Sequence, residues 1–225
     1  MELSAFSSEK QTRCWVACID LLGFSDAVVR GDWATIISIY EQSLEELAES
    51  PGRSTRVNYT WFSDTFLLYT NDDSAASFLD IEILARLFVG GLVLRQIPMH
   101  GALSCGGFFA HAEDNIFIGP ALVEAYRLCE DQNWIGFVLS PSALKQLVAV
   151  EIGVDALMKY RYYNIPRKKG KNPRHGLPAL ILGWPKRNDG RNDCYESLKR
   201  MRECAGKCSV RRKYDRTLRF LNESD

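Results

Sequence analysis

Two aspartates stand where strand-forming residues end or turn. Asp20 follows the apolar run "CWVACI" at 14–19, and Asp64 lies in "WFSDT" at 61–65, between two segments rich in β-branched and aromatic residues. A carboxylate at the end of an apolar strand is costly unless a cation or hydrogen-bond donors satisfy it. Carboxylate oxygens are the donors that Mg²⁺ and Mn²⁺ prefer when substrate phosphates complete the coordination. The pair therefore predicts a site for two divalent metal ions and phosphoryl transfer.

The segment that follows Asp20 adds to this chemistry. In "LLGFS" at 21–25, backbone N–H groups at the start of a helix form a natural phosphate cradle, and Gly23 permits close approach. The competing interpretation is that Asp20 and Asp64 only cap turns. For either residue alone that interpretation is favoured, whereas the two segments together favour a site. Proximity of the two aspartates does not follow from secondary structure alone.

Strands and helices alternate around these residues. The run at 14–19 is apolar on both faces, which is typical of a central strand, and apolar residues recur at helical spacing over 33–48. Segments 56–62 and 66–70 predict a hairpin with Asp64 in its turn. After Ser74, a helix cap, the pattern predicts a helix at 75–96, a strand at 99–111 and a helix at 120–131 opened by Gly119 and Pro120.

The rest of the chain continues the alternation. We expect strands at 134–140, 160–165 and 178–184, a helix at 141–150, and a charged helical tail from about 193. A hairpin among helical crossovers predicts an α+β fold with a mixed or mostly antiparallel sheet. We expect one catalytic domain over 1–190, with 191–225 as a helical extension of the same domain.

Composition narrows the function classes. The 225 residues are 46% hydrophobic and have a formal net charge of zero. The net charge therefore does not indicate nucleic acid or a membrane surface as the partner. No leader-like or membrane-spanning segment is evident, which predicts a cytoplasmic protein. The seven cysteines are odd in number and mostly lie in apolar runs, which favours buried thiols over disulfides. A zinc site at Cys204 and Cys208 is not expected, because no second ligand pair stands nearby.

Taken in order, several segments resemble the class III nucleotidyl cyclase catalytic domain, with its ferredoxin-like βαββαβ core and, here, extra C-terminal strands and helices. The chain is most similar to the pyrimidine cyclases of bacterial Pycsar anti-phage systems. The resemblance runs from about residue 14 to the C-terminus. It rests on "CIDLLGFSDAV", "FSDTFLLY", "HGALSCGGFF", "IGPALVEAYRLCE", "LGWP" and "RTLRFLN".

This resemblance implies cyclisation of a nucleoside triphosphate. The 3′-hydroxyl would attack the α-phosphate, pyrophosphate would leave, and Asp20, Leu21 and Asp64 would hold two Mg²⁺ or Mn²⁺ ions. It also implies a head-to-tail homodimer with sites at the interface and a product read by a separate effector protein. Composition and hydropathy favour neither a membrane nor a nucleic-acid partner. On family grounds, UTP is expected over CTP.

Departures from the family bear on the base and the transition state. Purine cyclases carry Lys where this chain has Thr60, and often Asp where it has Ile116, which fits a pyrimidine base. The family also uses an Asn/Arg pair at the transition state. In this chain Val123 stands at the Asn position and Arg127 matches the Arg, although Arg127 is equally well interpreted as a solvated helix residue. Many relatives have Arg where this chain has His100, for which a structural role is expected.

Other interpretations stay open. The loop "PRKKGK" at 166–171 supplies Lys168 or Lys169 to triphosphate oxygens, or is simply solvated. The charged helical tail from about 193 either binds RNA or phage components, or its basic residues form the solvent-exposed face of a helix. Besides uridylate cyclisation, the alternatives are cytidylate cyclisation, a catalytically silent cyclase-like signalling domain, and a palm polymerase or diguanylate cyclase with a related core.

Overall fold

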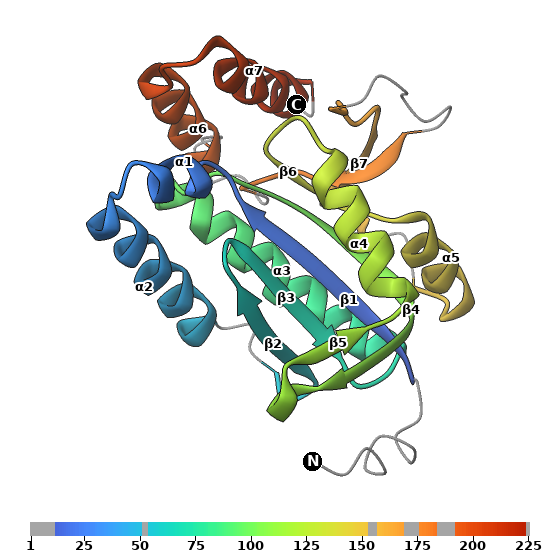
Figure 1. Cartoon of the computed structure of the whole chain (residues 1–225). Helices are drawn as coiled ribbons and strands as arrows, with labels where there is room; N and C mark the ends of the chain where they lie inside the picture. Colours follow the sequence, from blue (N-terminus) through green and yellow to red (C-terminus); the bar gives the residue numbers. More distant parts are fainter. Residues whose placement is uncertain (1–11, 51–53, 153–156, 169–175, 184–191, 224–225) are drawn as a thin grey trace.

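A computed structural model describes residues 12–50, 54–152, 157–168, 176–183 and 192–223 (Figure 1). Within these ranges the side chains of Ser25 and Ala27 are not described. Lys169, the N-terminal segment 1–11 and the "WP" of "LGWP" lie outside the described residues.

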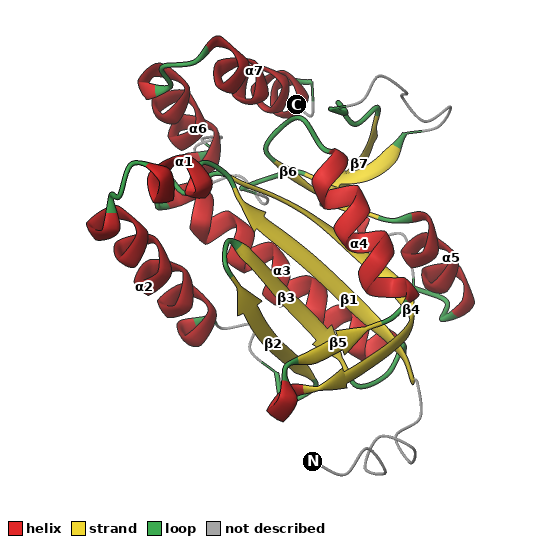
Figure 2. Cartoon of the chain, viewed as in Figure 1, coloured by secondary structure: helices red, strands yellow, loops and turns green. Residues whose placement is uncertain are grey.

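Strands and helices follow one another in an α+β order (Figure 2). The strands are β1 (Thr12–Leu21), β2 (Val57–Phe62), β3 (Thr65–Thr70), β4 (Met99–His111), β5 (Ile116–Ile118), β6 (Gly136–Leu139), β7 (Tyr160–Tyr163) and β8 (Leu177–Leu180). The helices are α1 (Phe24–Val29), α2 (Trp33–Glu49), α3 (Ala75–Leu94), the short 3₁₀ turn η2 (Ala112–Asp114), α4 (Pro120–Asp131), α5 (Pro141–Ala149), α6 (Asp193–Cys204) and α7 (Cys208–Asn222).

The strands form one sheet in the order β2-β3-β1-β4-β6-β8-β7, with β5 paired to β4 outside this path. Strand β4 pairs β6 in parallel, and the other described pairings are antiparallel. The mixed, mostly antiparallel sheet expected from the sequence is therefore confirmed. Strand β1 lies between β3 and β4, which makes it the central strand that its apolar run predicts.

Helices cover both faces of this sheet (Figure 2). Helix α3 packs on the face that buries Trp15, Ala17 and Ile19 of β1. Helix α4 packs on the other face, where its Ala125 and Cys129 contact Cys18. Side chains alternate along a strand, so Asp20 shares the α4 face with Cys18. The core thus forms two layers, one on each face of the sheet. The side chain of Asp20, the candidate metal-binding residue, lies on the face that α4 covers.

Local signals account for the helix boundaries. The side chains of Asp32, Ser74 and Ser140 accept hydrogen bonds from backbone N–H groups in the first turns of α2, α3 and α5.

Gly91 of α3 lies against the Glu46 side chain of α2, where an added Cβ would come within 2.1 Å of that side chain. Gly91 therefore allows the close packing of α3 against the Glu46 side chain of α2.

Strand β5 and the division of the helical tail into two helices were not expected from the sequence. Strand β5 is only Ile116–Ile118, too short for an alternating pattern, and it forms where residue Asn115 adopts a left-handed conformation with φ of 55°. The charged tail forms two helices, and Cys194 and Leu198 of α6 and Tyr214 and Leu218 of α7 join the main core.

Five of the seven cysteines are buried, whereas Cys204 and Cys208 are exposed. Among the described residues, no helix has the length and apolar character needed to cross a bilayer.

Candidate active site at the ends of β1 and the β2–β3 hairpin

The two aspartates lie at the same end of the sheet. Strand β1 pairs antiparallel with β3, the outgoing limb of the hairpin, and places Asp20 opposite Thr65. The N–H of Leu21 donates to the carbonyl of Asp64 over 2.8 Å. Because β1 ends where β3 begins, the hairpin turn with Asp64 is held beside the end of β1. The pairing thus settles the proximity that secondary structure alone left open.

Hydrogen bonds fix the Asp20 carboxylate. Its Oδ1 accepts from the Thr65 hydroxyl over 3.2 Å, and its Oδ2 lies 3.0 Å from Nε2 of His100. Burial lowers the pKa of His100, against the opposing effect of Asp20. The imidazole is therefore neutral near pH 7 and donates its Nε2–H to Asp20. His100 is fully buried on β4, opposite Asp20 in the β1–β4 ladder.

Asp64 is less well satisfied than Asp20. Burial and the nearby Asp20 carboxylate both raise the pKa of Asp64, while hydrogen bonds within the turn oppose the shift. Ser63 adopts a positive φ of 54° in this turn, and the Tyr40 hydroxyl of α2 donates to the Ser63 carbonyl. The turn is thus anchored to α2 while its carboxylate faces a second negative charge.

The donor set fits a divalent cation shared with a ligand. Two mutually repelling carboxylates gain most from a cation between them, and Mg²⁺ commonly takes one or two protein carboxylates and fills its other positions with water and phosphate oxygens. Leu21 is apolar, so its only possible ligand atom is the backbone carbonyl oxygen. No cluster of three or more His, Cys, Asp and Glu that could hold a metal occurs in the described ranges.

The segment after Asp20 differs in one respect from the expected phosphate cradle. The N–H of Leu22 donates to the carbonyl of Pro98 over 2.7 Å, so this group is already used. Gly23 has a φ of 85° and precedes α1, whose first N–H groups, those of Phe24 and Ser25, have no partner within the helix. The expectation for Leu22 as an N–H donor is corrected, and Gly23, Phe24 and Ser25 remain as candidates.

A pocket of about 800 Å³ opens beside Asp64 on the α4 face of the sheet. Its wall includes Thr60 and Trp61 of β2, Asn115 and Phe117 around β5, and Tyr126 of α4. Asp64 is the only charged residue among the described residues that line it. Thr60, the expected base-contacting residue, thus stands in an aromatic and mostly uncharged pocket.

Arg127 lies apart from the aspartates of its own chain. Ala125 and Cys129 of α4 face Cys18, whereas Arg127 is exposed and lines a different pocket with Val123 and Arg167. Lys168 is exposed and its N–H donates to the carbonyl of Asp131 over 2.7 Å, which brings the Lys168 backbone to the end of α4.

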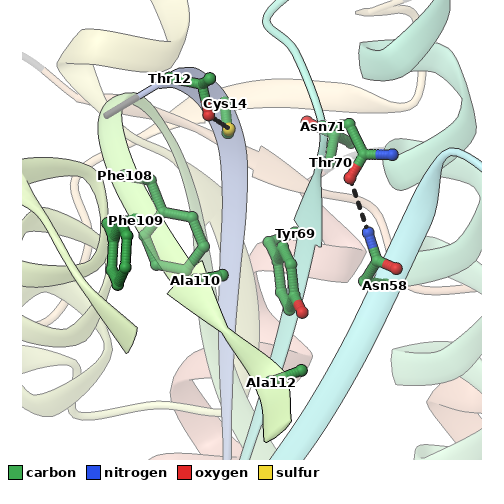
Figure 3. A pocket seen from close by; sticks show the side chains of 10 residues that line it. All are labelled: Thr12, Cys14, Asn58, Tyr69, Thr70, Asn71, Phe108, Phe109, Ala110 and Ala112. Atoms are coloured by element: carbon green, nitrogen blue, oxygen red, sulfur yellow. Dashed lines mark hydrogen bonds between the residues drawn. The ribbon is translucent and has the colours of Figure 1, made fainter. Parts of the chain in front are cut away.

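Another pocket, of about 360 Å³, lies toward the opposite end of the strands (Figure 3). Thr12 and Cys14 at the start of β1, Tyr69 and Phe108 line it, and Asn58 donates to Asn71 across its edge over 2.9 Å. It contains neither Asp20 nor Asp64 and is separate from the candidate site.

The contact between His100 and Asp20 is the feature that sequence reasoning missed. We expect His100→Leu to weaken Mn²⁺ binding by about 10- to 100-fold, because losing the partner of a metal-binding carboxylate typically has that effect. His100→Gln, whose amide can donate to Asp20, should retain part of the affinity. Paramagnetic resonance titration with Mn²⁺ measures the difference, and melting temperatures control for folding. Equal Mn²⁺ affinity in a folded Leu variant would contradict this role.

The fold is that of the catalytic domains of class III nucleotidyl cyclases. The chain is similar to the adenylyl cyclase CyaB from P. aeruginosa, with 14% identity, a TM-score of 0.56, and coverage of 80% of this chain and 97% of that one. It is also similar to adenylate cyclases from Trypanosoma brucei in their monomeric state, with 8% identity, a TM-score of 0.54, and coverage of 80% and 93%.

A third similar structure is the non-canonical dimeric guanylyl cyclase domain of the RhoGC fusion protein from the aquatic fungus Blastocladiella emersonii. Here the identity is 12%, the TM-score is 0.53, and the coverage is 77% of this chain and 99% of that one. No protein-family profile and no curated protein sequence matches this chain. At these identities the likeness concerns the fold.

Proposed function

We propose that this protein is a nucleotide cyclase that converts UTP to 3′,5′-cyclic UMP and pyrophosphate. The observation that carries the proposal is the pair Asp20 and Asp64, held side by side by the β1–β3 pairing on a cyclase fold. The similar structures are named as adenylyl and guanylyl cyclases, so the general reaction has their support. The choice of a pyrimidine rests on the resemblance to the Pycsar pyrimidine cyclases and on the residues of the pocket around Thr60.

The chain's own residues have separate tasks in this reaction. Asp20 and Asp64 would hold two divalent ions, whose chemistry would be to lower the pKa of the attacking 3′-hydroxyl and to offset the charge of the leaving pyrophosphate. His100 and Thr65 hold the Asp20 carboxylate in one orientation. The N–H groups of Gly23, Phe24 and Ser25 contact phosphate oxygens from the turn after β1.

A twofold homodimer would complete each site. Exposed apolar residues lie on the hairpin, on β5 and on α4: Trp61 and Phe62, Ile118, and Val123 and Tyr126, with Phe62 86% exposed. Burying this surface against a second copy is favourable, because exposed apolar patches commonly mark protein interfaces. Arg127, which lies apart from its own chain's aspartates, would then reach the site of the partner. We place residues 1–190 and the helices of 191–225 in one catalytic domain.

The pocket around Thr60 favours a pyrimidine base. A purine-reading site needs charged or polar partners for the purine edge, and neither Thr60 nor the residues around Ile116 supply a charged pair. Polar groups built into a pocket discriminate between bases by orders of magnitude. The product would be a second messenger read by a separate effector protein in anti-phage defence, as the resemblance implies.

We expect UTP to be cyclised with the highest kcat/KM, CTP to be second, and ATP and GTP to be at least tenfold poorer, about the least that a mismatched polar pocket imposes. The measurement incubates the purified protein with each ribonucleotide and Mn²⁺ and resolves the products by mass. A higher kcat/KM for ATP or GTP would reject the pyrimidine assignment. Preference for CTP would make the protein a cytidylate cyclase, and absence of any cyclic product would favour a silent signalling domain.

A further inference from the structure

Helix α7 lies across the end of the sheet that carries Asp20 (Figure 1). At its start, Nζ of Lys207 lies 3.0 Å from Oδ2 of Asp26 in α1. Further along, Arg216 donates to the carbonyl of Asn133 over 2.8 Å, and the Thr217 hydroxyl bonds to both the N–H and the carbonyl of Ile135. These anchors hold the middle of α7 between α1, which follows β1, and the start of β6.

Lys213 occupies this middle stretch and is half-buried. Burial lowers the pKa of Lys213, nearby Lys168 lowers it further, and Asp20 raises it. The pKa of His100 responds to these same side chains, since Asp20 raises it while Lys168 and Lys213 lower it. Asp20, His100, Lys168 and Lys213 therefore form one electrostatic group, although they come from β1, β4, the segment after β7 and α7.

The segment that carries Lys168 is held at the same place. Lys168 donates its N–H to the carbonyl of Asp131, and Pro166 accepts from the N–H of Asn133, each over 2.7 Å. Asn133 is also the residue that Arg216 of α7 contacts. The segments that carry the two lysines are thus both held by residues 131–135, which are the end of α4 and the loop that leads to β6.

Neither lysine forms an ion pair with any described residue. A half-buried ammonium group without a carboxylate is costly, and a second ammonium group nearby increases the cost. A ligand with several adjacent negative charges would offset both. A polyphosphate has that charge, and divalent ions at Asp20 and Asp64 would draw it to the same end of the sheet.

We propose that Lys213 of the C-terminal helix, together with Lys168, binds the polyphosphate of the substrate in the same chain that supplies Asp20 and Asp64. This inference rests on the proposed function and extends it, because it makes α7 part of the active site. Lys213 would act through its charge on the β- and γ-phosphates, so it is a substrate-binding residue rather than a proton donor or acceptor.

The test measures binding of inorganic tripolyphosphate, with Mg²⁺ present, by titration calorimetry. We expect Lys213→Gln to weaken binding about tenfold, the effect of losing one charge-assisted hydrogen bond, and Lys213→Arg to stay within about threefold of wild type. Arg212→Gln is the matched control, because Arg212 is exposed on the same helix one position away. Binding by Lys213→Gln within twofold of wild type would overturn the proposal.

A second measurement needs no variant. Acetylation of the wild-type protein by a small amine-reactive reagent, followed by mass spectrometry, should show Lys213 protected by tripolyphosphate while Lys199, on the exposed part of α6, reacts as before. Reaction of Lys213 at an unchanged rate in the presence of saturating tripolyphosphate would also overturn the proposal.

The outcomes separate this inference from the proposed function. If the wild type cyclises a nucleotide and Lys213→Gln leaves KM unchanged, the inference fails while the function stands. If no nucleotide is cyclised but tripolyphosphate binds and depends on Lys213, the inference stands while the function fails.

Discussion

Asp64→Asn is expected to abolish nucleotide cyclisation, with a fall in kcat/KM of about a thousandfold or more. The asparagine side chain has no charge to hold a divalent ion, and such an ion contributes several kcal/mol to stabilising the charge that develops in phosphoryl transfer. Asp20→Asn should have an equally large effect, because both carboxylates serve one site. Product formation with each variant, at saturating Mg²⁺ or Mn²⁺, measures the loss.

The fold should tolerate the Asp64 change. A carboxyl whose pKa is raised by folding is harder to ionise in the folded state, so the free energy of unfolding falls as pH rises through the raised pKa. Burial and Asp20 raise the pKa of Asp64 in this way. At pH 7 without metal, Asp64→Asn should therefore melt at the same temperature as wild type or slightly higher. A large drop in melting temperature would instead show a structural role for Asp64.

Glu41→Gln, a change of an exposed carboxylate on α2, is the matched control and should keep full activity. Mn²⁺ binding gives a readout that does not depend on turnover, and both aspartate variants should bind Mn²⁺ more weakly than the control. Near wild-type cyclisation by either aspartate variant, with either metal ion, would reject the two-metal interpretation.

Mixing two inactive variants should restore activity to about a quarter of wild type, if Arg127 serves the partner's site. Asp64→Ala and Arg127→Ala are each expected to be inactive alone. After full subunit exchange, half of the dimers are heterodimers, and in each of these one site collects both defects while the other has none. Half of the dimers times one of two sites gives about a quarter. Cyclic nucleotide formed by the mixture, compared with each variant alone, is the readout.

The matched control mixes Asp20→Ala with Asp64→Ala. Both residues come from the same chain's β1 and hairpin, so every site in a heterodimer keeps one defect and no activity should return. Inactivity of the first mixture, with subunit exchange demonstrated, would remove Arg127 from a role in the partner's site. Full activity of Arg127→Ala alone would remove it from the site altogether.

Local sequence patterns determined most of the elements. The alternation of β-branched and aromatic residues identified the hairpin of β2 and β3, and capping residues such as Ser74 marked where α3 begins. The run at 14–19 was recognised as central because it is apolar on both faces. These signals arise from residues close together in the chain, so they can be identified without knowledge of the fold.

The same patterns indicated the metal-binding chemistry through the two aspartates, because a carboxylate that interrupts an apolar segment stands out in the sequence. They could not show that Asp20 and Asp64 meet, since that depends on β1 pairing with β3 rather than β2. Nor could they show that Leu22 has already used its N–H on Pro98, a residue far along the chain.

His100 and Lys213 illustrate the limit most clearly. In the sequence, His100 is a polar residue in an apolar strand and Lys213 is one cation in a basic helix. Only the ladder between β1 and β4 brings His100 to Asp20, and only the anchoring of α7 at Asn133 and Ile135 brings Lys213 near both. The residue types determined which chemistry was possible, and long-range strand pairing and helix packing determined which groups meet, because such contacts leave no periodicity in the sequence.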